Sequence, residues 1–228
     1  MNRTTVTTSW DDGHVYDIKL AQMLKQYNIA GTFYISPENR ELLELERLNK
    51  EEVIELSKNF EIGAHTVTHP RLSKITDSEA GHEIAGSKKF LEEWIGKEVK
   101  SFCYPGGDFK PVHETMVKAA GFKLARTVKR YATQIGNDPF AVPTTVHAYR
   151  HLKDIKLPMI NLGFDEYLHW DVLANKLFDD VMQKGGVFHL WGHSWEIDKH
   201  KDWERLERVL KYISNRPEVS YLNNGELI

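Results

Sequence analysis

The chain has 228 residues, of which 41% are hydrophobic, and its 30 basic and 33 acidic side chains give a formal net charge of −3. The near balance of charge gives no electrostatic basis for binding nucleic acid or an anionic membrane, and the single cysteine, Cys103, excludes an intramolecular disulfide. No apolar stretch reaches the length of a membrane span and no leader precedes Thr5, so we expect a cytoplasmic protein.

Short runs rich in β-forming residues alternate with segments whose hydrophobic side chains recur at helical spacing. The expected strands lie at residues 6–10, 30–35, 60–64, 99–103, 122–127 and 187–191. The expected helices lie at residues 20–27, 51–58, 80–94, from Pro111 onward, 173–181 and 206–213, and an irregular, proline-containing stretch fills residues 129–167. This alternation favours a parallel sheet, open or closed into a barrel. Because no repeat or low-complexity linker interrupts it, we expect a single domain over residues 1–228.

Polar clusters follow the predicted strands at the point where each strand ends. These clusters are Asp11 with Asp12, His65, residues 104–107, Arg126, and His193. Folds with parallel strands collect their active sites at the carboxyl ends of the strands. The positions of the clusters therefore predict one catalytic mouth.

The first cluster, Asp11 and Asp12 before Gly13, places two carboxylates side by side. Neighbouring side chains of a strand point to opposite faces, but the geometry loosens at a strand end, so both carboxylates can reach one site. One can then bind a metal ion while the other handles a proton. An Asp-Gly pair is also a common turn signal, so this stretch alone leaves a simple turn open.

The second cluster contains His65 and His69, whose spacing places both rings on one side of a helical turn, where they can share a metal ion. Two other pairs, beginning at His147 and His189, have the same spacing, so spacing alone is weak support. The first pair differs from them in following a strand while a carboxylate pair follows another. Two histidines and one aspartate make a competent divalent-metal site with water in the open position.

Late in the chain, His193 lies nearest the predicted mouth and is the candidate general acid. His189 shares its face of the strand and is expected to be a buried, hydrogen-bonded histidine. Trp191 and Trp195 are either core side chains or platforms that stack on a sugar ring.

Glycines follow the fourth predicted strand, at Gly106 and Gly107 after Tyr104. They let backbone N–H groups approach a ligand closely, as an oxyanion site needs, although an ordinary turn explains the pattern equally well. His113 and the charged run at residues 41–55 are interpreted as solvated faces of helices.

Taken together and in this order, these segments resemble the NodB-homology polysaccharide deacetylases. The family's first motif, two aspartates before a glycine, matches residues 9–13, and its His-Ser/Thr-x-x-His motif matches residues 65–69. Its strand-end motif with an aromatic residue, proline and glycine is similar to residues 102–107, and its late histidine motif resembles residues 193–196. The resemblance runs from about Thr5 to Lys211. It implies a distorted (β/α) barrel of about seven strands.

The resemblance also implies a role for each cluster. Asp11 would be the general base and His193 the general acid, with Asp12, His65 and His69 as ligands of one divalent metal ion. Zinc is the expected ion by ligand type, and Co²⁺, Mn²⁺, Fe²⁺ or Ni²⁺ suit the same ligands. The substrate would be an N-acetylated carbohydrate. The residues that would hold the substrate and its oxyanion are Tyr104, Gly106, Gly107 and Trp195.

The chain departs from the family pattern at two motifs. The family often places an arginine where this chain has Cys103, and Arg126, at the end of the next strand, is the candidate to orient Asp11 instead. The family's aspartate-tryptophan motif has no clear counterpart.

The expected function is therefore metal-dependent removal of N-acetyl groups from a polysaccharide or oligosaccharide. The alternatives are hydrolysis of a non-sugar amide, such as a cyclic ureide, and carbohydrate binding without turnover. A non-haem iron oxygenase is disfavoured, because those enzymes commonly place the first histidine and the carboxylate close together on an all-β scaffold, whereas Asp12 and His65 are far apart here. No feature of the sequence indicates an oligomeric state.

Overall fold

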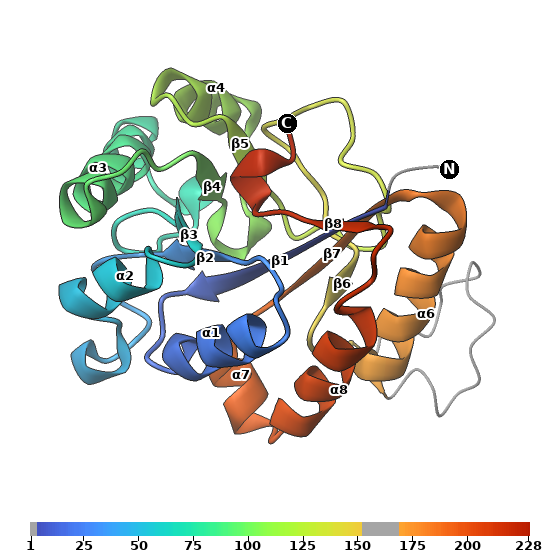
Figure 1. Cartoon of the computed structure of the whole chain (residues 1–228). Helices are drawn as coiled ribbons and strands as arrows, with labels where there is room; N and C mark the ends of the chain where they lie inside the picture. The colour runs from blue at the N-terminus through green and yellow to red at the C-terminus, as the bar shows by residue number, and fades with distance from the viewer. Residues whose placement is uncertain (1–3, 152–168) are drawn as a thin grey trace.

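The computed structural model describes residues 4–151 and 169–228, in which parallel strands form the centre of the molecule and helices surround them (Figure 1). The strands follow one another along the sheet in the order β5-β4-β3-β2-β1-β7-β6, and β8 pairs with β1 beside that path. Every strand pair is parallel. The strands are β1 (Thr4–Asp12), β2 (Thr32–Ile35), β3 (Glu61–Ala64), β4 (Ser101–Cys103), β5 (Leu124–Arg126), β6 (Val146–His147), β7 (Gly186–Gly192) and β8 (Val219–Tyr221).

The helices begin and end at recognisable signals. Thr76 caps α3 by accepting the N–H of Glu79, Gly96 ends the same helix in the left-handed conformation, and Pro111 opens α4. No helix among these described segments is long and apolar enough to cross a bilayer. The helices are α1 (Asp17–Gln26), α2 (Lys50–Leu56), α3 (Asp77–Ile95), α4 (Pro111–Ala119), α6 (Trp170–Lys184), α7 (Ser194–Lys199) and α8 (Trp203–Ile213).

The two edges of the sheet are joined by the segment that runs from Pro139 into β6. The backbone carbonyl of Pro139 accepts a hydrogen bond from the N–H of Ala125 at 2.8 Å, and that of Val142 accepts one from the N–H of Thr127 at 2.9 Å. The segment therefore first lies along β5. It then continues as β6, which pairs with β7. The sheet thereby curls into a deformed barrel, which confirms the predicted fold class. The short strand β6, inside the stretch expected to be irregular, was not predicted.

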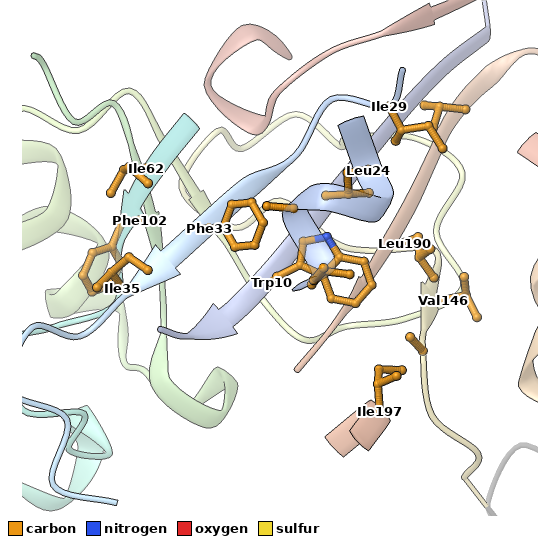
Figure 2. Close-up of a cluster of buried hydrophobic side chains, with 14 of the residues drawn as sticks. Trp10, Leu24, Ile29, Phe33, Ile35, Ile62, Phe102, Val146, Leu190 and Ile197 are labelled. Atoms are coloured by element: carbon orange, nitrogen blue, oxygen red, sulfur yellow. The ribbon is translucent and has the colours of Figure 1, made fainter. Parts of the chain in front are cut away.

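Side chains alternate between the inside and the outside of the barrel. On β1, Val6 and Trp10 face the surrounding helices, where fully buried Trp10 lies near Leu24 of α1 and Ile197 of α7 (Figure 2). Ser9, on the opposite face, contacts a buried histidine of β7 through a 2.8 Å hydrogen bond. The apolar layer therefore lies between strands and helices, and polar side chains occupy the inside of the barrel.

The N-terminal end of the barrel is closed by the C-terminal 3₁₀ turn η5 (Asn224–Glu226). Asn224 accepts a hydrogen bond from the Tyr34 hydroxyl at 2.9 Å, and Glu61 of β3 accepts the N–H of Gly225 at 2.8 Å. At the opposite end, the carboxyl ends of the strands, the predicted site residues line a cleft.

Candidate metal and acid–base site

Asp11 and Asp12 end β1, and the backbone turns sharply between strand and loop. Asp12 has a φ of 84° and Gly13 a φ of 72°, both in the left-handed region. The turn at Asp12 brings its carboxylate to the same cleft as Asp11, where strict alternation would separate the two. A left-handed aspartate is uncommon, and such strain gathers at functional sites.

Asp11 forms a buried ion pair with Arg126. The guanidinium donates to Asp11 Oδ1, and neither side chain is more than 3% exposed. Arg126 pairs in register with Cys103 on the neighbouring strand, so it fills the place that Cys103 leaves without charge. Burial alone would raise the pKa of Asp11, but Arg126, His65 and His193 outweigh burial and lower that pKa to about 2. Asp11 is therefore an anion held in one orientation.

Three ligand atoms converge beside Asp11. Asp12 Oδ1 lies 3.7 Å from His65 Nε2 and 3.3 Å from His69 Nε2, and the two Nε2 atoms are 3.2 Å apart. Ligands about 2.1 Å from a tetrahedral zinc ion lie about 3.4 Å from one another. The spacing of these three atoms therefore fits a divalent metal ion.

The protons on the two histidines strengthen that fit. His65 Nδ1 lies 2.7 Å from the carbonyl oxygen of Cys103, which can only accept, so the proton is on Nδ1. Burial and the nearby His69 lower the pKa of His65 to about 4, so its ring is neutral and Nε2 carries a lone pair. On His69, the Glu41 carboxylate lies 3.0 Å from Nδ1 and favours a proton there. Two lone pairs and the Asp12 carboxylate then face one another, an arrangement that a cation relieves.

The loop that carries the two histidines is not the helical turn that the spacing predicted. Thr66 and His69 both have a left-handed φ, of 66° and 64°, and residues 65–69 form no helix. Glu83 of α3 fixes the loop by accepting the N–H groups of Val67 at 2.7 Å and Thr68 at 2.8 Å. A tertiary contact therefore brings the rings together.

His193, directly after β7, faces the same cleft. Its Nε2 lies 4.0 Å from Asp12 Oδ2, and its Nδ1 donates to Glu196 at 3.3 Å. Burial alone would lower the pKa of His193, but Asp12, Glu196 and Asp11 outweigh burial and raise it to about 9. The geometry therefore provides a protonated imidazole opposite the Asp11 anion.

A second pair of histidines extends from Glu196. His147 Nε2 lies 3.1 Å from the same Glu196 oxygen, and His147 Nδ1 contacts His151 Nε2 at 2.8 Å. Burial lowers the pKa of His147 to about 4, so this ring is neutral beside the charged His193–Glu196 pair. The ring stacks on Trp191 at 3.9 Å between centroids.

Trp195, predicted to be core or to stack on a sugar, lies at the edge of the cleft in α7. Its indole N–H donates to Asp12 Oδ2 at 2.8 Å. The cleft has a volume of about 390 Å³. Besides the residues already described, its lining includes Arg71, Gly106, Val128 and Arg130.

The predicted oxyanion donors are narrowed to one. The N–H of Tyr104 donates to the backbone carbonyl of Arg126 at 3.3 Å, and the N–H of Gly107 donates to the backbone carbonyl of Tyr104 at 2.8 Å. Both N–H groups are therefore already hydrogen-bonded within the protein. The Tyr104 ring is buried against Phe109. Gly106 alone of the three lines the cleft. The interpretation of Tyr104 and Gly107 as oxyanion donors was wrong, because the turn uses their N–H groups itself.

The interpretation of His113 and of residues 41–55 as solvated helical faces needs correction, whereas that of His189 is confirmed. His113 is fully buried in α4, where its Nδ1 accepts the N–H of Lys110 at 3.0 Å. The charged run at residues 41–55 forms a 3₁₀ turn at Glu44–Glu46 and becomes α-helical only at Lys50, and Glu41 contacts His69 instead of facing solvent alone. His189 is buried and hydrogen-bonded, as predicted.

Sequence reasoning gave no role to Glu41, Glu83, His147 or Glu196. The usable signal for Glu196 was its place three residues after His193, which puts both side chains on one turn of helix. Glu41 and Glu83 act from loops and helices that the sequence does not place beside the histidine loop.

Comparison with known proteins agrees with this geometry. A family model described as polysaccharide deacetylase matches residues 1–125, and the chain therefore belongs to that family. A peptidoglycan-N-acetylglucosamine deacetylase of Bacillus cereus is 28% identical over 189 residues, which cover 82% of this chain and 86% of that protein. A second B. cereus protein of the same name is 29% identical over 111 residues, and the match spans only 38% of its length.

Solved structures share the fold at low identity. The chitin deacetylase of Colletotrichum lindemuthianum is 15% identical, with a TM-score of 0.64 over 100% of this chain and 90% of that chain. A CE4 family pseudoenzyme from Bacillus anthracis is 17% identical, with a TM-score of 0.59 over 99% of this chain and 66% of that chain. These likenesses establish the barrel fold.

Proposed function

We propose that the protein is a divalent-metal-dependent deacetylase that hydrolyses the amide of an N-acetylated carbohydrate to acetate and a free amine. The observation that carries this proposal is the convergence of Asp12, His65 and His69 between an anionic Asp11 and a protonated His193. The name of the B. cereus relative supports the choice of an N-acetylated sugar.

A bound ion, zinc by ligand type, would polarise the acetyl carbonyl as a Lewis acid and would lower the pKa of the water bound to it. Asp11 takes a proton as water attacks the acetyl carbonyl, and Arg126 holds the carboxylate in place for that step. Gly106 lines the cleft, and its N–H would stabilise the developing oxyanion. His193 donates its proton to the nitrogen as the C–N bond breaks, so that the amine leaves neutral. General acid–base catalysis contributes about 10²- to 10⁴-fold to such reactions.

The test pairs metal content with acetate release from N-acetylated oligosaccharides, for wild type, His69→Ala and Asp11→Asn. The exposed His82, on α3, provides the matched control His82→Ala. We expect about one ion per chain in wild type and in Asp11→Asn, with acetate release lost in Asp11→Asn. His69→Ala should lose both ion and activity, and His82→Ala should keep both.

The possible failures point to different alternatives. Bound metal without acetate release from any N-acetylated sugar would move the substrate to another amide, such as a cyclic ureide, or leave a carbohydrate-binding role. Wild-type protein that binds no metal after addition of zinc or cobalt would overturn the proposal.

A further inference from the structure

We infer that Trp195 and Glu41 are positioning residues, which orient the metal ligands Asp12 and His69 from outside the ligand set and thereby set the affinity of the site for its ion. The inference rests on the metal site of the proposed function and goes beyond the reaction. It gives Trp195 a role other than stacking on a sugar.

Trp195 selects which oxygen of Asp12 faces the histidines. Its indole N–H is 2.8 Å from Asp12 Oδ2, while Oδ1 faces His69 Nε2 at 3.3 Å and His65 Nε2 at 3.7 Å. A carboxylate rotates about its Cβ–Cγ bond, and a hydrogen bond to one oxygen fixes that rotation. An indole N–H only donates, so Trp195 cannot itself compete for the ion. Oδ1 is thereby left as the atom offered to the metal.

The position of Trp195 is fixed by the chain that carries the candidate acid. Strand β7 ends at Gly192, His193 follows, and α7 begins at Ser194, so Trp195 lies in the first turn of that helix. The strand that delivers His193 therefore also delivers the donor for Asp12.

Glu41 acts on the other side of the cleft. Its carboxylate lies 3.0 Å from His69 Nδ1, on the ring atom opposite the one that faces Asp12. A carboxylate at this nitrogen favours the tautomer with a free Nε2. Because the contact is an ion pair without hydrogen-bond geometry, it fixes the ring less firmly than the indole N–H fixes Asp12. The Glu41 side chain is 69% exposed, so solvent weakens its effect relative to that of Trp195. The third ligand, His65, is held by a backbone carbonyl, which side-chain substitution does not remove.

The test is zinc affinity, measured by competition with a chromophoric chelator in the absence of substrate. We expect Trp195→Phe to raise the zinc Kd by about 10- to 100-fold, and Glu41→Ala to raise it by a smaller factor. The matched control is Trp203→Phe, because Trp203 makes the same kind of bond, to Asp198 at 2.9 Å, away from the cleft. Its zinc Kd should equal that of wild type.

A wild-type zinc Kd in either test variant overturns the inference for that residue, and equal weakening by Trp203→Phe overturns it for Trp195. Should Trp195→Phe fail to fold, Trp195→Gln, whose side-chain amide keeps an N–H donor, must bind zinc more tightly than the similarly sized Trp195→Leu. The visible spectrum of the Co²⁺ form gives a second readout, because freeing Oδ2 changes the ligand field. Wild type that binds zinc without releasing acetate would overturn only the reaction.

Discussion

Asp11 and Asp12 are chemically identical neighbours, and the groups that contact them separate their roles. Arg126 neutralises Asp11 inside the barrel, whereas Asp12 faces two imidazoles and an indole N–H at the cleft. The positive charge beside Asp11 comes from Arg126 on β5, which pairs in register with Cys103 on β4. It therefore lies one strand further along the sheet than the arginine of the family's motif.

Removing the Arg126 charge should damage both stability and turnover. In Arg126→Met, the Asp11 carboxylate stays buried without its partner, and breaking such a pair costs about 3–5 kcal/mol. We expect the free energy of unfolding, measured in urea, to fall by that amount and acetate release to fall with it. Arg126→Lys keeps the charge and should lose less of both. Arg126→Met with wild-type stability would contradict the role of the pair.

The hydrogen bond from His193 to Glu196 should matter only where the leaving group needs a proton. In Glu196→Gln, we expect hydrolysis of an N-acetylated sugar to fall by about 10-fold or more, and by no more than the 10²–10⁴-fold that general acid–base catalysis contributes in total. Hydrolysis of 4-nitrophenyl acetate, whose phenolate leaves unprotonated, should change little. Equal losses on both substrates would show that Glu196 acts on something other than the acid.

The candidate metal ligands could be predicted from sequence, whereas the residues that support them could not. Asp12, His65 and His69 lie in short contiguous motifs at strand ends, where residue type and spacing carry the chemistry. His147 and Glu41 reach the site only through tertiary folding, from a two-residue strand and a loop. Local sequence has no periodic signal for such contacts.

At the scale of elements, helix α3 determines the shape of the histidine loop. Glu83 accepts two backbone N–H groups and the Thr68 hydroxyl, the last at 2.6 Å, and thereby compensates for the left-handed conformations of Thr66 and His69. A helix that packs on the outside of the barrel thus holds the two candidate metal ligands, His65 and His69, in register.

Loosening this contact should weaken the site without breaking the barrel. Hydrogen bonds to a charged acceptor contribute about 1.5–3 kcal/mol each, so Glu83→Ala should lower zinc affinity and the unfolding midpoint together. Glu79→Ala, on the same helix, removes the hydrogen bonds that its carboxylate accepts from the N–H and the hydroxyl of Thr76, and should leave zinc affinity unchanged. Calorimetric titration with zinc measures the affinity of each variant, and thermal denaturation measures its unfolding midpoint. Identical zinc affinities for the two variants would contradict the role of Glu83.

The longer elements could be predicted because each has a clear period and a clear end. Strand β7, from Gly186 to Gly192, extends the predicted run by one residue at each end. The two- and three-residue strands β6 and β8 were missed, because pairing with long neighbours rather than their own sequence makes them strands. The periodic pattern therefore left the sheet open or closed, and only the resemblance to the family predicted the barrel.

At the scale of the whole molecule, the barrel is built with its apolar layer outside the strands and a polar interior. His189 occupies that interior, bonded to Ser9 at 2.8 Å and donating its backbone N–H to Thr145 at 2.9 Å. Burial, with the nearby Arg126 charge, lowers the pKa of His189 from 6.5 to about 3. The folded protein therefore keeps this ring neutral at pH values where the unfolded chain protonates it.

Acid should destabilise the protein through this residue. A depressed histidine pKa means that its contribution to stability is present above pH 6.5 and is lost as the pH falls toward 3, by about 1.4 kcal/mol per pH unit. Glutamine does not titrate, so this contribution is absent from His189→Gln. Between pH 6 and pH 4, the unfolding free energy of the variant should therefore fall less steeply than that of wild type, by about 1.4 kcal/mol per pH unit. Urea titrations of chelator-treated protein isolate the effect from metal release, and the exposed His82→Gln should retain the wild-type slope. Parallel pH profiles for wild type and His189→Gln would mean that another buried group controls acid unfolding, with the neutral His147 ring the next to test.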